Sequence, residues 1–326
     1  MNILIVCKGS LPPKKYGGTE RVVWSLIKAL HQLRHNVFIL TEKLTECEWA
    51  TSIARDPERS IDEQIPTEID VVHFHTGEFC STKPYLTTRH GNGHINKENF
   101  HNSVFVSHKH AQNHGCEAFV YNGLDWSDYR QPNLESTQRL KRYHFLGKAA
   151  WRLKNVRGAI AITRKANVAL DVLGGRRLNF NMGFRLTLDR HVKFHGMVDN
   201  NVKCNVLEKS RGLIFPVTWE EPFGLAIIES LFMGAPVFGT PYGSLPELIN
   251  TPEVGFLANN EDALVDAINH GKYNPMQCHE FVRDTSDHLS MAKGYIKKYE
   301  AIINGENLNQ SFSKPVNQLK QLPYFR

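Results

Sequence analysis

Two carboxylates, Glu221 and Glu229, lie in the stretch WEEPFGLAIIESLFMGAPVFGTPYGSLP, residues 219–246. Glu221 precedes a Pro-Phe-Gly turn, and Glu229 follows eight residues later, about two turns along a helix. A turn that opens a helix presents unpaired backbone N–H groups, which attract phosphate. Carboxylates accept hydrogen bonds from hydroxyls. The pattern therefore favours a ligand that combines phosphate with hydroxyls, such as a nucleotide sugar.

A solvated surface helix with an acidic residue near its start is the alternative for this stretch. The neighbours of Glu229 weigh against it, because Ile227, Ile228, Leu231 and Phe232 leave no continuous polar face. We expect Glu229 to be buried, and a buried carboxylate needs hydrogen-bond donors.

A second candidate loop, PPKKYGGTE, places Gly17 and Gly18 directly before an expected helix. Glycine lets a ligand approach the backbone closely, although a generic turn explains the pair equally well. The loop does not match GxGxxG, so dinucleotide binding is not favoured. His90 ends an expected strand, where a structural role is the alternative, and the histidine-rich stretch after it matches no metal-ligand spacing.

The elements that must position these residues follow the same pattern in both halves of the chain. Short apolar runs, typical of strands, alternate with segments whose apolar residues have helical spacing. In the first half we expect strands at Asn2–Cys7, Val37–Leu40, Asp70–His75, Leu86–Gly91 and Ser103–Ser107, and a helix at Val22–Leu33. In the second half we expect strands at Tyr143–Leu146, Leu170–Leu173, Val192–His195, Leu213–Pro216 and Pro236–Phe238, and helices at Val156–Ala166, Val202–Arg211 and Glu261–Asn269. Both halves predict an α/β fold with a doubly wound parallel sheet.

The polar, Pro-containing segment Tyr129–Leu140 predicts the domain crossing. We expect an N-terminal domain over 1–130 and a C-terminal domain over 131–288. A long helix from Leu289 to Ile303 and the tail to Arg326 are expected to pack back on the first domain. Residues 44–69 are predicted to be a helix or loop insert.

Composition indicates an ordinary globular chain of 326 residues, 41% hydrophobic and 22% charged, with six scattered cysteines. The cysteine spacing indicates neither a disulfide framework nor a zinc site, which fits a reducing cytoplasm. The sequence contains no run of about 18 apolar residues, which a membrane-spanning helix requires. The chain is therefore expected to be soluble or peripheral.

Positive charge is concentrated between Arg139 and Lys193, which hold 14 Lys and Arg against two acids, Asp171 and Asp189. Such a segment attracts nucleic acid, a membrane surface or a phosphorylated small molecule, and a solvated basic face is the remaining alternative. Interleaved aromatic residues typical of single-strand binding are absent, so no nucleic-acid partner is expected.

Several segments in the same order resemble family-4-type retaining glycosyltransferases with the GT-B fold. The opening PPKKYGGTERVVWSLIKALHQLRHNVFILT and the later WEEPFGLAIIESLFMGAPVFGT carry the resemblance, with VYNGLD, YHFLGKAAWRLKN and FHGMVDN between them. It covers about Met1 to Ile303. The resemblance implies two Rossmann-like doubly wound domains facing across a cleft.

The resemblance also implies residue roles. Glu229 would hold the ribose hydroxyls and Glu221 a hydroxyl of the donor sugar. The backbone amides at Phe223, Gly224 and Leu225 would hold the diphosphate or sugar.

Lys154 matches the lysine that grips the diphosphate, and Lys148 stands where the family usually has arginine, which replaces a bidentate fork by a point charge. Gly17 and Gly18 would approach the donor phosphates and the acceptor, and His90 the reactive carbon of the donor.

The implied activity is sugar transfer with retention from a nucleotide sugar to a saccharide or lipid-linked acceptor in surface-glycan biosynthesis, with no metal or other cofactor. The implied location is the cytoplasm, with peripheral contact at the inner face of the membrane left open. A GT-B epimerase, a phosphorylase and a non-catalytic sugar-nucleotide-binding subunit remain alternatives. Donor, acceptor, linkage and oligomeric state are not predicted.

Overall fold

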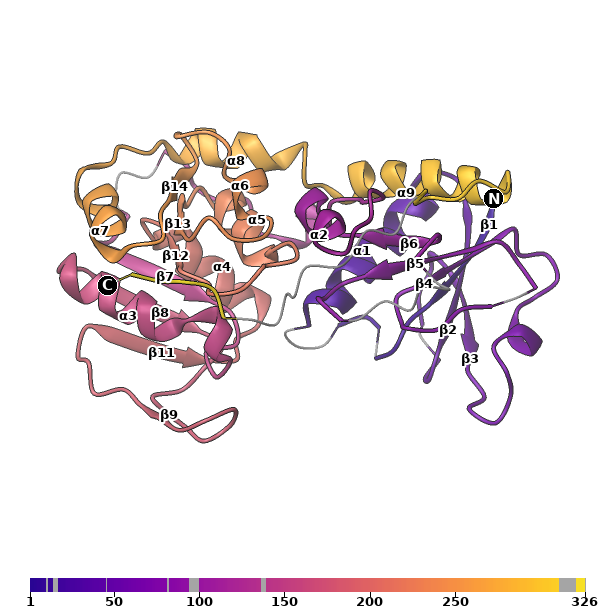
Figure 1. Ribbon diagram of the computed structural model, residues 1–326, viewed down its shortest axis with the longest axis horizontal. Coiled ribbons are helices and arrows are strands. Elements are labelled where there is room, and N and C mark those ends of the chain that lie inside the picture. The colour runs from indigo at the N-terminus through magenta and orange to yellow at the C-terminus, as the bar shows by residue number, and fades with distance from the viewer. Residues whose placement is uncertain are drawn as a thin grey trace. The chain divides into compact units, whose positions relative to one another are not determined.

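The computed structural model describes residues 1–9, 11–13, 17–44, 46–80, 82–93, 100–135, 139–310 and 321–325. The chain forms two units: unit 1 is Met1–Asp125 with Ser286–Asn317, and unit 2 is Trp126–Thr285 with Gln318–Arg326 (Figure 1). Lys14–Tyr16 of the glycine loop, His94 of the histidine-rich stretch and 311–320 of the tail lie outside the described residues.

Unit 1 is built on a six-stranded parallel sheet in the order β3-β2-β1-β4-β5-β6. Its strands are β1 (Asn2–Val6), β2 (Asn36–Thr41), β3 (Thr51–Ala54), β4 (Val71–Phe74), β5 (Tyr85–Arg89) and β6 (Ser103–Phe105). Its helices are α1 (Gly18–Gln32), the short η1 (Asp62–Gln64), α2 (His108–Asn113) and α9 (His288–Ile303). The doubly wound sheet predicted for the first half is confirmed.

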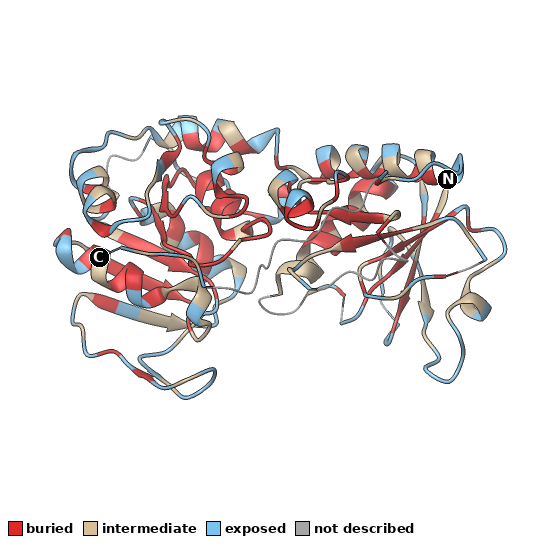
Figure 2. Ribbon diagram, viewed as in Figure 1, coloured by how far each residue is buried: buried red, intermediate tan, exposed pale blue. Residues whose placement is uncertain are grey.

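Helical periodicity decides how α1 packs in unit 1. The residues that the 3.6-residue spacing places on one face are all buried: Val22, Val23, Leu26, Ile27 and Leu30. The central strands β1 and β4 are almost wholly buried (Figure 2). Helix α9 packs beside α1 and against β4 and β5, with Tyr295 and Tyr299 fully buried.

Unit 2 repeats the architecture, with a six-stranded parallel sheet in the order β11-β8-β7-β12-β13-β14. The strands are β7 (Arg142–Leu146), β8 (Ala169–Leu173), β11 (Val192–Gly196), β12 (Leu213–Phe215), β13 (Val237–Gly239) and β14 (Gly255–Leu257). A separate antiparallel pair consists of β9 (Leu178–Asn179) and β10 (Arg185–Leu186). The helices are η3 (Trp126–Asp128), η4 (Arg152–Lys154), α3 (Val156–Lys165), α4 (Asn200–Lys209), α5 (Leu225–Phe232), α6 (Leu245–Leu248), α7 (Glu261–His270) and α8 (Pro275–Arg283).

Three local expectations differ from the structure. Residues 44–69 contain the edge strand β3, which is only half-buried and therefore lacks an apolar signature. Residues 178–186, for which no element was predicted, form the β9–β10 hairpin. The tail was expected to pack with the first domain, and its described residues divide between the units. The Leu308 N–H donates to the carbonyl of His101 in unit 1, whereas the Phe325 N–H donates to the carbonyl of Asn259 in unit 2.

Among the described residues, no helix is both long and apolar enough to cross a membrane. Across the same ranges, no group of three or more His, Cys, Asp and Glu side chains is arranged to hold a metal ion.

Candidate functional site

The candidate site of unit 2 is built from the loops that follow β7, β12 and β13. All strands of this sheet are parallel, so these loops emerge at one edge. The carboxyl edge of a doubly wound sheet is where such folds bind ligands. The predicted residues Lys148, Lys154, Glu221, Phe223, Gly224 and Leu225 all belong to these loops or to the helix starts next to them.

Lys154 and Glu221 form an ion pair at this edge, with 2.6 Å between Nζ and Oε2. The indole N–H of Trp219 donates to the same oxygen at 2.9 Å. The Lys154 ammonium also lies 5.1 to 5.6 Å from the ring centroids of Phe215, Trp151 and Trp219. An aromatic cage holds the ammonium by cation–π attraction and keeps its position defined.

The loop that carries Lys154 is tied to its neighbours by the backbone. Asn155, in the left-handed region at φ 55°, caps α3 by accepting from the Gly158 N–H at 2.9 Å. The Thr218 N–H donates to the carbonyl of Leu153 at 2.9 Å, which joins the loop after β12 to the loop after β7. Lys154 and Glu221 are therefore fixed by two joined loops.

Gly243 holds the loop of Glu221 from the other side. A Cβ at Gly243, whose φ is 61°, would stand 2.2 Å from the amide nitrogen and 2.3 Å from the carbonyl oxygen of Glu221. The Gly243 N–H donates to Oε2 of Glu220 at 2.8 Å, and the Ser244 N–H to the carbonyl of Glu221 at 2.9 Å. Only glycine permits this close backbone approach.

Helix α5 begins directly after this loop. Its N-cap residue is Gly224, at φ 90°, and no side chain caps the helix start. The first N–H groups of a helix have no intrahelical partner and carry the positive end of its dipole. The start of α5 is thus suited to an anion.

Glu229 lies inside α5 with none of its side chain exposed, as the apolar neighbours predicted. Its Oε1 accepts from the Tyr129 hydroxyl at 2.8 Å and pairs with the Lys203 ammonium, which also lies 4.9 Å from the centroid of the Tyr129 ring. Sequence reasoning missed both partners. The available signal was that Glu229 needs donors and that Lys203 shares the inward face of α4 with Cys204 and Leu207.

Lys148 follows Gly147 at the end of β7 and is exposed. Within the described residues, no ion pair involves Lys148. Its charge therefore remains available at the same edge as the start of α5.

The other predicted residues belong to unit 1. Gly17 is the N-cap of α1, where a Cβ would lie 2.3 Å from a carboxylate oxygen of Glu20, and Gly18 is the first residue of that helix. His90 follows β5 and is half-buried.

His90 belongs to a histidine network inside unit 1. Its Nε2 lies 2.8 Å from Nδ1 of His75, and burial lowers the pKa of His90 to about 4. The ring centroid of His75 lies 4.0 Å from that of His73 at an interplanar angle of 33°. The ring nitrogens of His73 bond the hydroxyls of Tyr299 and Thr88 at 2.7 Å each. His90 is therefore neutral at pH 7.

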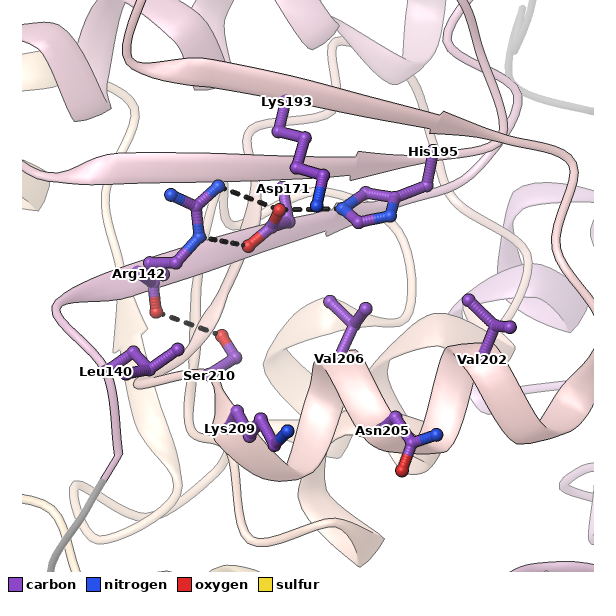
Figure 3. Close-up of a pocket in the computed structure, with 10 residues that line it drawn as sticks. All are labelled: Leu140, Arg142, Asp171, Lys193, His195, Val202, Asn205, Val206, Lys209 and Ser210. Atoms are coloured by element: carbon purple, nitrogen blue, oxygen red, sulfur yellow. Dashed lines mark hydrogen bonds and ion pairs between the residues drawn. The ribbon is translucent and has the colours of Figure 1, made fainter.

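A cavity of about 460 Å³ lies elsewhere in unit 2, between α4 and the face formed by β7, β8 and β11 (Figure 3). It is lined by Leu140, Arg142, Asp171, Lys193, His195, Val202, Asn205, Val206, Lys209 and Ser210. None of the predicted site residues lines this cavity.

Asp171 is the centre of the cavity's polar wall. Arg142 donates to both of its oxygens at 2.6 and 2.8 Å, and His195 Nε2 lies 2.7 Å from Oδ1. Burial acts to raise the pKa of Asp171, but the hydrogen bonds from Arg142 and His195 outweigh it and lower that pKa. The cluster ties the edge strand β11 to β8 and β7, so we assign it a structural role.

Comparison with known proteins defines the class of fold. The fold is that of the GT-B glycosyltransferases, as the resemblance predicted. AviGT4, described as a glycosyltransferase of avilamycin A biosynthesis, matches with a TM-score of 0.77 at 20% identity, over 93% of this chain and 98% of its own. Sucrose-phosphate synthase from Thermosynechococcus elongatus matches with a TM-score of 0.72 at 15% identity, over 94% and 100%. HepE of Anabaena, described in complex with UDP and glucose, matches with a TM-score of 0.65 at 15% identity, over 92% and 100%.

Sequence comparison matches part of unit 2 to one protein family. Residues 136–270 match the model of the family "Glycosyl transferases group 1". An uncharacterised 41.2 kDa protein in the cps region of Klebsiella pneumoniae is 30% identical over 118 residues, which is 34% of this chain and 33% of that protein. The match thus spans about a third of the length of this curated relative.

Proposed function

We propose that this chain is a metal-independent retaining glycosyltransferase that moves a sugar from a nucleotide-sugar donor to a saccharide or lipid-linked acceptor. One observation carries the proposal: Lys154 and Glu221 meet at the carboxyl edge of the unit 2 sheet, beside the uncapped start of α5. This arrangement lies within the segment that matches the glycosyl transferase family.

The proposed donor site stabilises the leaving diphosphate with fixed charge. The Lys154 ammonium, the exposed Lys148 and the N–H groups at the start of α5 supply positive potential at one edge of unit 2. Preorganised donors of this kind are worth most when charge develops in the transition state. Negative charge on the departing nucleoside diphosphate is thereby balanced without a metal ion.

The carboxylates would contact the sugars on either side of the diphosphate. Glu221 already accepts from Lys154 and Trp219, which leaves its other oxygen, Oε1, for a donor-sugar hydroxyl. Glu229 has no exposed surface. A ribose contact at Glu229 therefore requires the side chains around it, Lys203 and Tyr129, to move when the donor binds.

Gly17, Gly18 and His90 would serve the donor and acceptor from unit 1. His90 is neutral because burial lowers its pKa to about 4. It would therefore contribute a hydrogen bond near the reactive carbon rather than a positive charge. That role suits a transition state in which the sugar itself becomes cationic, since a second cation there would oppose it.

The relative in the Klebsiella cps region supports a role in surface-glycan assembly. We place that role at the cytoplasmic side of the membrane as part of the same proposal. HepE, described with UDP and glucose, makes UDP-glucose the first donor to try.

A thermal-shift screen against nucleoside diphosphates and their sugars tests the proposal. A ligand at about 100 times its dissociation constant adds roughly 2.7 kcal/mol to stability. We expect a shift with one nucleotide class and slow hydrolysis of the matching sugar donor, unaffected by EDTA. NMR of the transferred sugar would then show the anomeric configuration of the donor retained.

Absence of a shift with every nucleotide would contradict the proposal. A non-catalytic subunit is the second candidate, favoured by the closed packing of Glu229 against Lys203. A non-catalytic subunit would bind the donor but show no turnover with any acceptor, whereas the proposed glycosyltransferase would turn the donor over.

A further inference from the structure

The β9–β10 hairpin of unit 2 has an apolar face that points to solvent. Leu178 pairs with Leu186 and Asn179 with Arg185, so the two leucines share one face of the paired strands and Asn179 and Arg185 the other. The apolar residues of the strands and of the turn between and beside them are Leu178, Phe180, Met182, Phe184, Leu186 and Leu188, and they are 47%, 72%, 52%, 61%, 53% and 78% exposed. At the tip the rings of Phe180 and Phe184 lie 5.8 Å apart.

The polar face of the hairpin is held against the body of unit 2. Arg185 and Thr187 are 6% and 4% exposed, and the Arg185 guanidinium donates to the Arg176 carbonyl and the Thr187 hydroxyl at 2.9 Å each. Arg177 donates to the carbonyls of Thr187 and Asp189 at 3.2 and 3.0 Å. These bonds fix the register, because a slip by one residue would exchange the two faces.

The hairpin therefore reverses the usual arrangement of a surface ribbon, in which apolar side chains face the core. The hairpin projects from the rest of unit 2 (Figure 1). Its six large exposed apolar side chains form a group, unlike apolar residues scattered singly over a surface. Contiguous exposed apolar patches of this kind mark interaction sites.

The charge around the apolar face indicates what covers it. Between residues 172 and 198 the only acid is Asp189, which pairs with Arg164. Arg176 and Arg190, at the base of the hairpin, are exposed. Near its tip Arg157 donates to the Phe184 carbonyl at 3.3 Å and is exposed as well. An apolar face with aromatic residues at its tip and cations at its margins complements an anionic bilayer surface.

We propose that the β9–β10 hairpin docks unit 2 on an anionic phospholipid bilayer, with Phe180, Met182 and Phe184 entering the interface and the surrounding arginines contacting headgroup phosphates. The docking needs no assumption about sugar transfer. It goes beyond the proposed function by assigning a membrane-binding element to unit 2.

Co-sedimentation of the full chain with vesicles tests the proposal. We expect binding to phosphatidylcholine vesicles that contain phosphatidylglycerol, weaker binding to phosphatidylcholine alone, and loss of the difference at high salt. The double variant Phe180→Ser/Phe184→Ser should lower the affinity for anionic vesicles by about tenfold or more, because it removes both interfacial aromatic rings. Phe256→Ser/Phe325→Ser is the matched control, since it removes two exposed phenylalanines of the same unit outside the hairpin.

Two further variants separate the apolar from the electrostatic contribution. Arg176→Glu/Arg190→Glu should abolish the preference for anionic lipid while leaving weak binding to neutral vesicles. In Phe180→Trp, brominated lipids should quench the added indole fluorescence.

Equal vesicle binding by the wild type and Phe180→Ser/Phe184→Ser would overturn the proposal, as would no binding by the wild type. A second copy of the chain as the true occupant would appear as a concentration-dependent dimer in sedimentation velocity, lost in the same double variant. Thermal shift by nucleotides is measured without vesicles, so failure of membrane docking and failure of the proposed function give different results.

Discussion

Lys203 and Glu229 form an ion pair inside unit 2 with only 5% and 0% of their side chains exposed. The Tyr129 hydroxyl supplies a further donor to the same carboxylate oxygen at 2.8 Å. Removing one member of a buried pair leaves the other charge without compensation. The pair therefore links helices α4 and α5 and makes the fold of unit 2 depend on both residues.

Lys203→Met should lower the free energy of unfolding by about 3 to 5 kcal/mol, measured by urea denaturation, because Glu229 is left buried and unpaired. Lys209→Met, at an exposed position of the same helix, should change it by less than about 0.5 kcal/mol. The double variant Lys203→Met/Glu229→Leu should recover most of the loss. A single-variant loss no larger than that of Lys209→Met would contradict this account of the pair.

Lys154→Ala should lower turnover of the donor by about two to three decades while the chain stays folded, since a charge-assisted donor to the transition state is lost. Turnover is measured as donor hydrolysis or transfer, and folding by circular dichroism. Lys165→Ala, at the exposed end of α3, should retain wild-type turnover. Near-normal turnover in Lys154→Ala would remove Lys154 from the proposed site.

Gly243→Ala should displace the Glu221 loop, because the new Cβ would overlap the backbone of Glu221 at 2.2 and 2.3 Å. Gly196→Ala is the control: its φ of 73° is equally left-handed, but nothing lies within 4 Å of the added Cβ. Gly196→Ala should cost only about 1 to 3 kcal/mol of backbone strain. Gly243→Ala should lose more stability and also the thermal shift with nucleotide; equal effects in the two variants would show that the close approach is unimportant.

Acid should destabilise unit 1 through its histidine network. Burial lowers the pKa of His90 to about 4 and holds those of His73 and His75 well below the ordinary value of 6.5. These residues are neutral in the folded state, whereas the unfolded chain binds protons once the pH falls below about 6.5. Stability present above that pH is therefore lost as the pH falls towards 4, by about 1.4 kcal/mol per pH unit for each histidine.

Urea denaturation between pH 7 and pH 4.5 measures this slope. His90→Gln should reduce it, whereas His270→Gln, whose side chain is 75% exposed, should not. An unchanged slope in His90→Gln would rule out the contribution of that residue.

The elements that follow a regular apolar period could be predicted from the sequence. The buried face of α1 and both parallel sheets were found in this way, and so were the turn before α5 and the burial of Glu229. The spacing of apolar residues predicts which side chains face the core, and in these elements the side chains predicted to be buried are buried.

The elements that reverse or lack that pattern could not be predicted. Strand β3 lies at the sheet edge with no fully buried residue, so no alternation marks it. The β9–β10 hairpin alternates strictly, but its apolar side faces outward. Lys203 is a lysine on an inward helix face, and only the position of Glu229 in space explains it.

The packing of α9 has a consequence for how the protein is made. Tyr299 and Tyr295 of this helix bond His73 and Thr88, which lie on β4 and β5 of unit 1. A ribosome completes all the strands of unit 2 before it reaches residues 288–303, so the N-terminal sheet remains without α9 while the rest of the chain emerges. Until then His73 lacks the Tyr299 hydroxyl, and the surface later covered by α9 is open. Unit 1 therefore stays without its last helix while all the strands of unit 2 are made, and the nascent chain needs protection from aggregation throughout that interval.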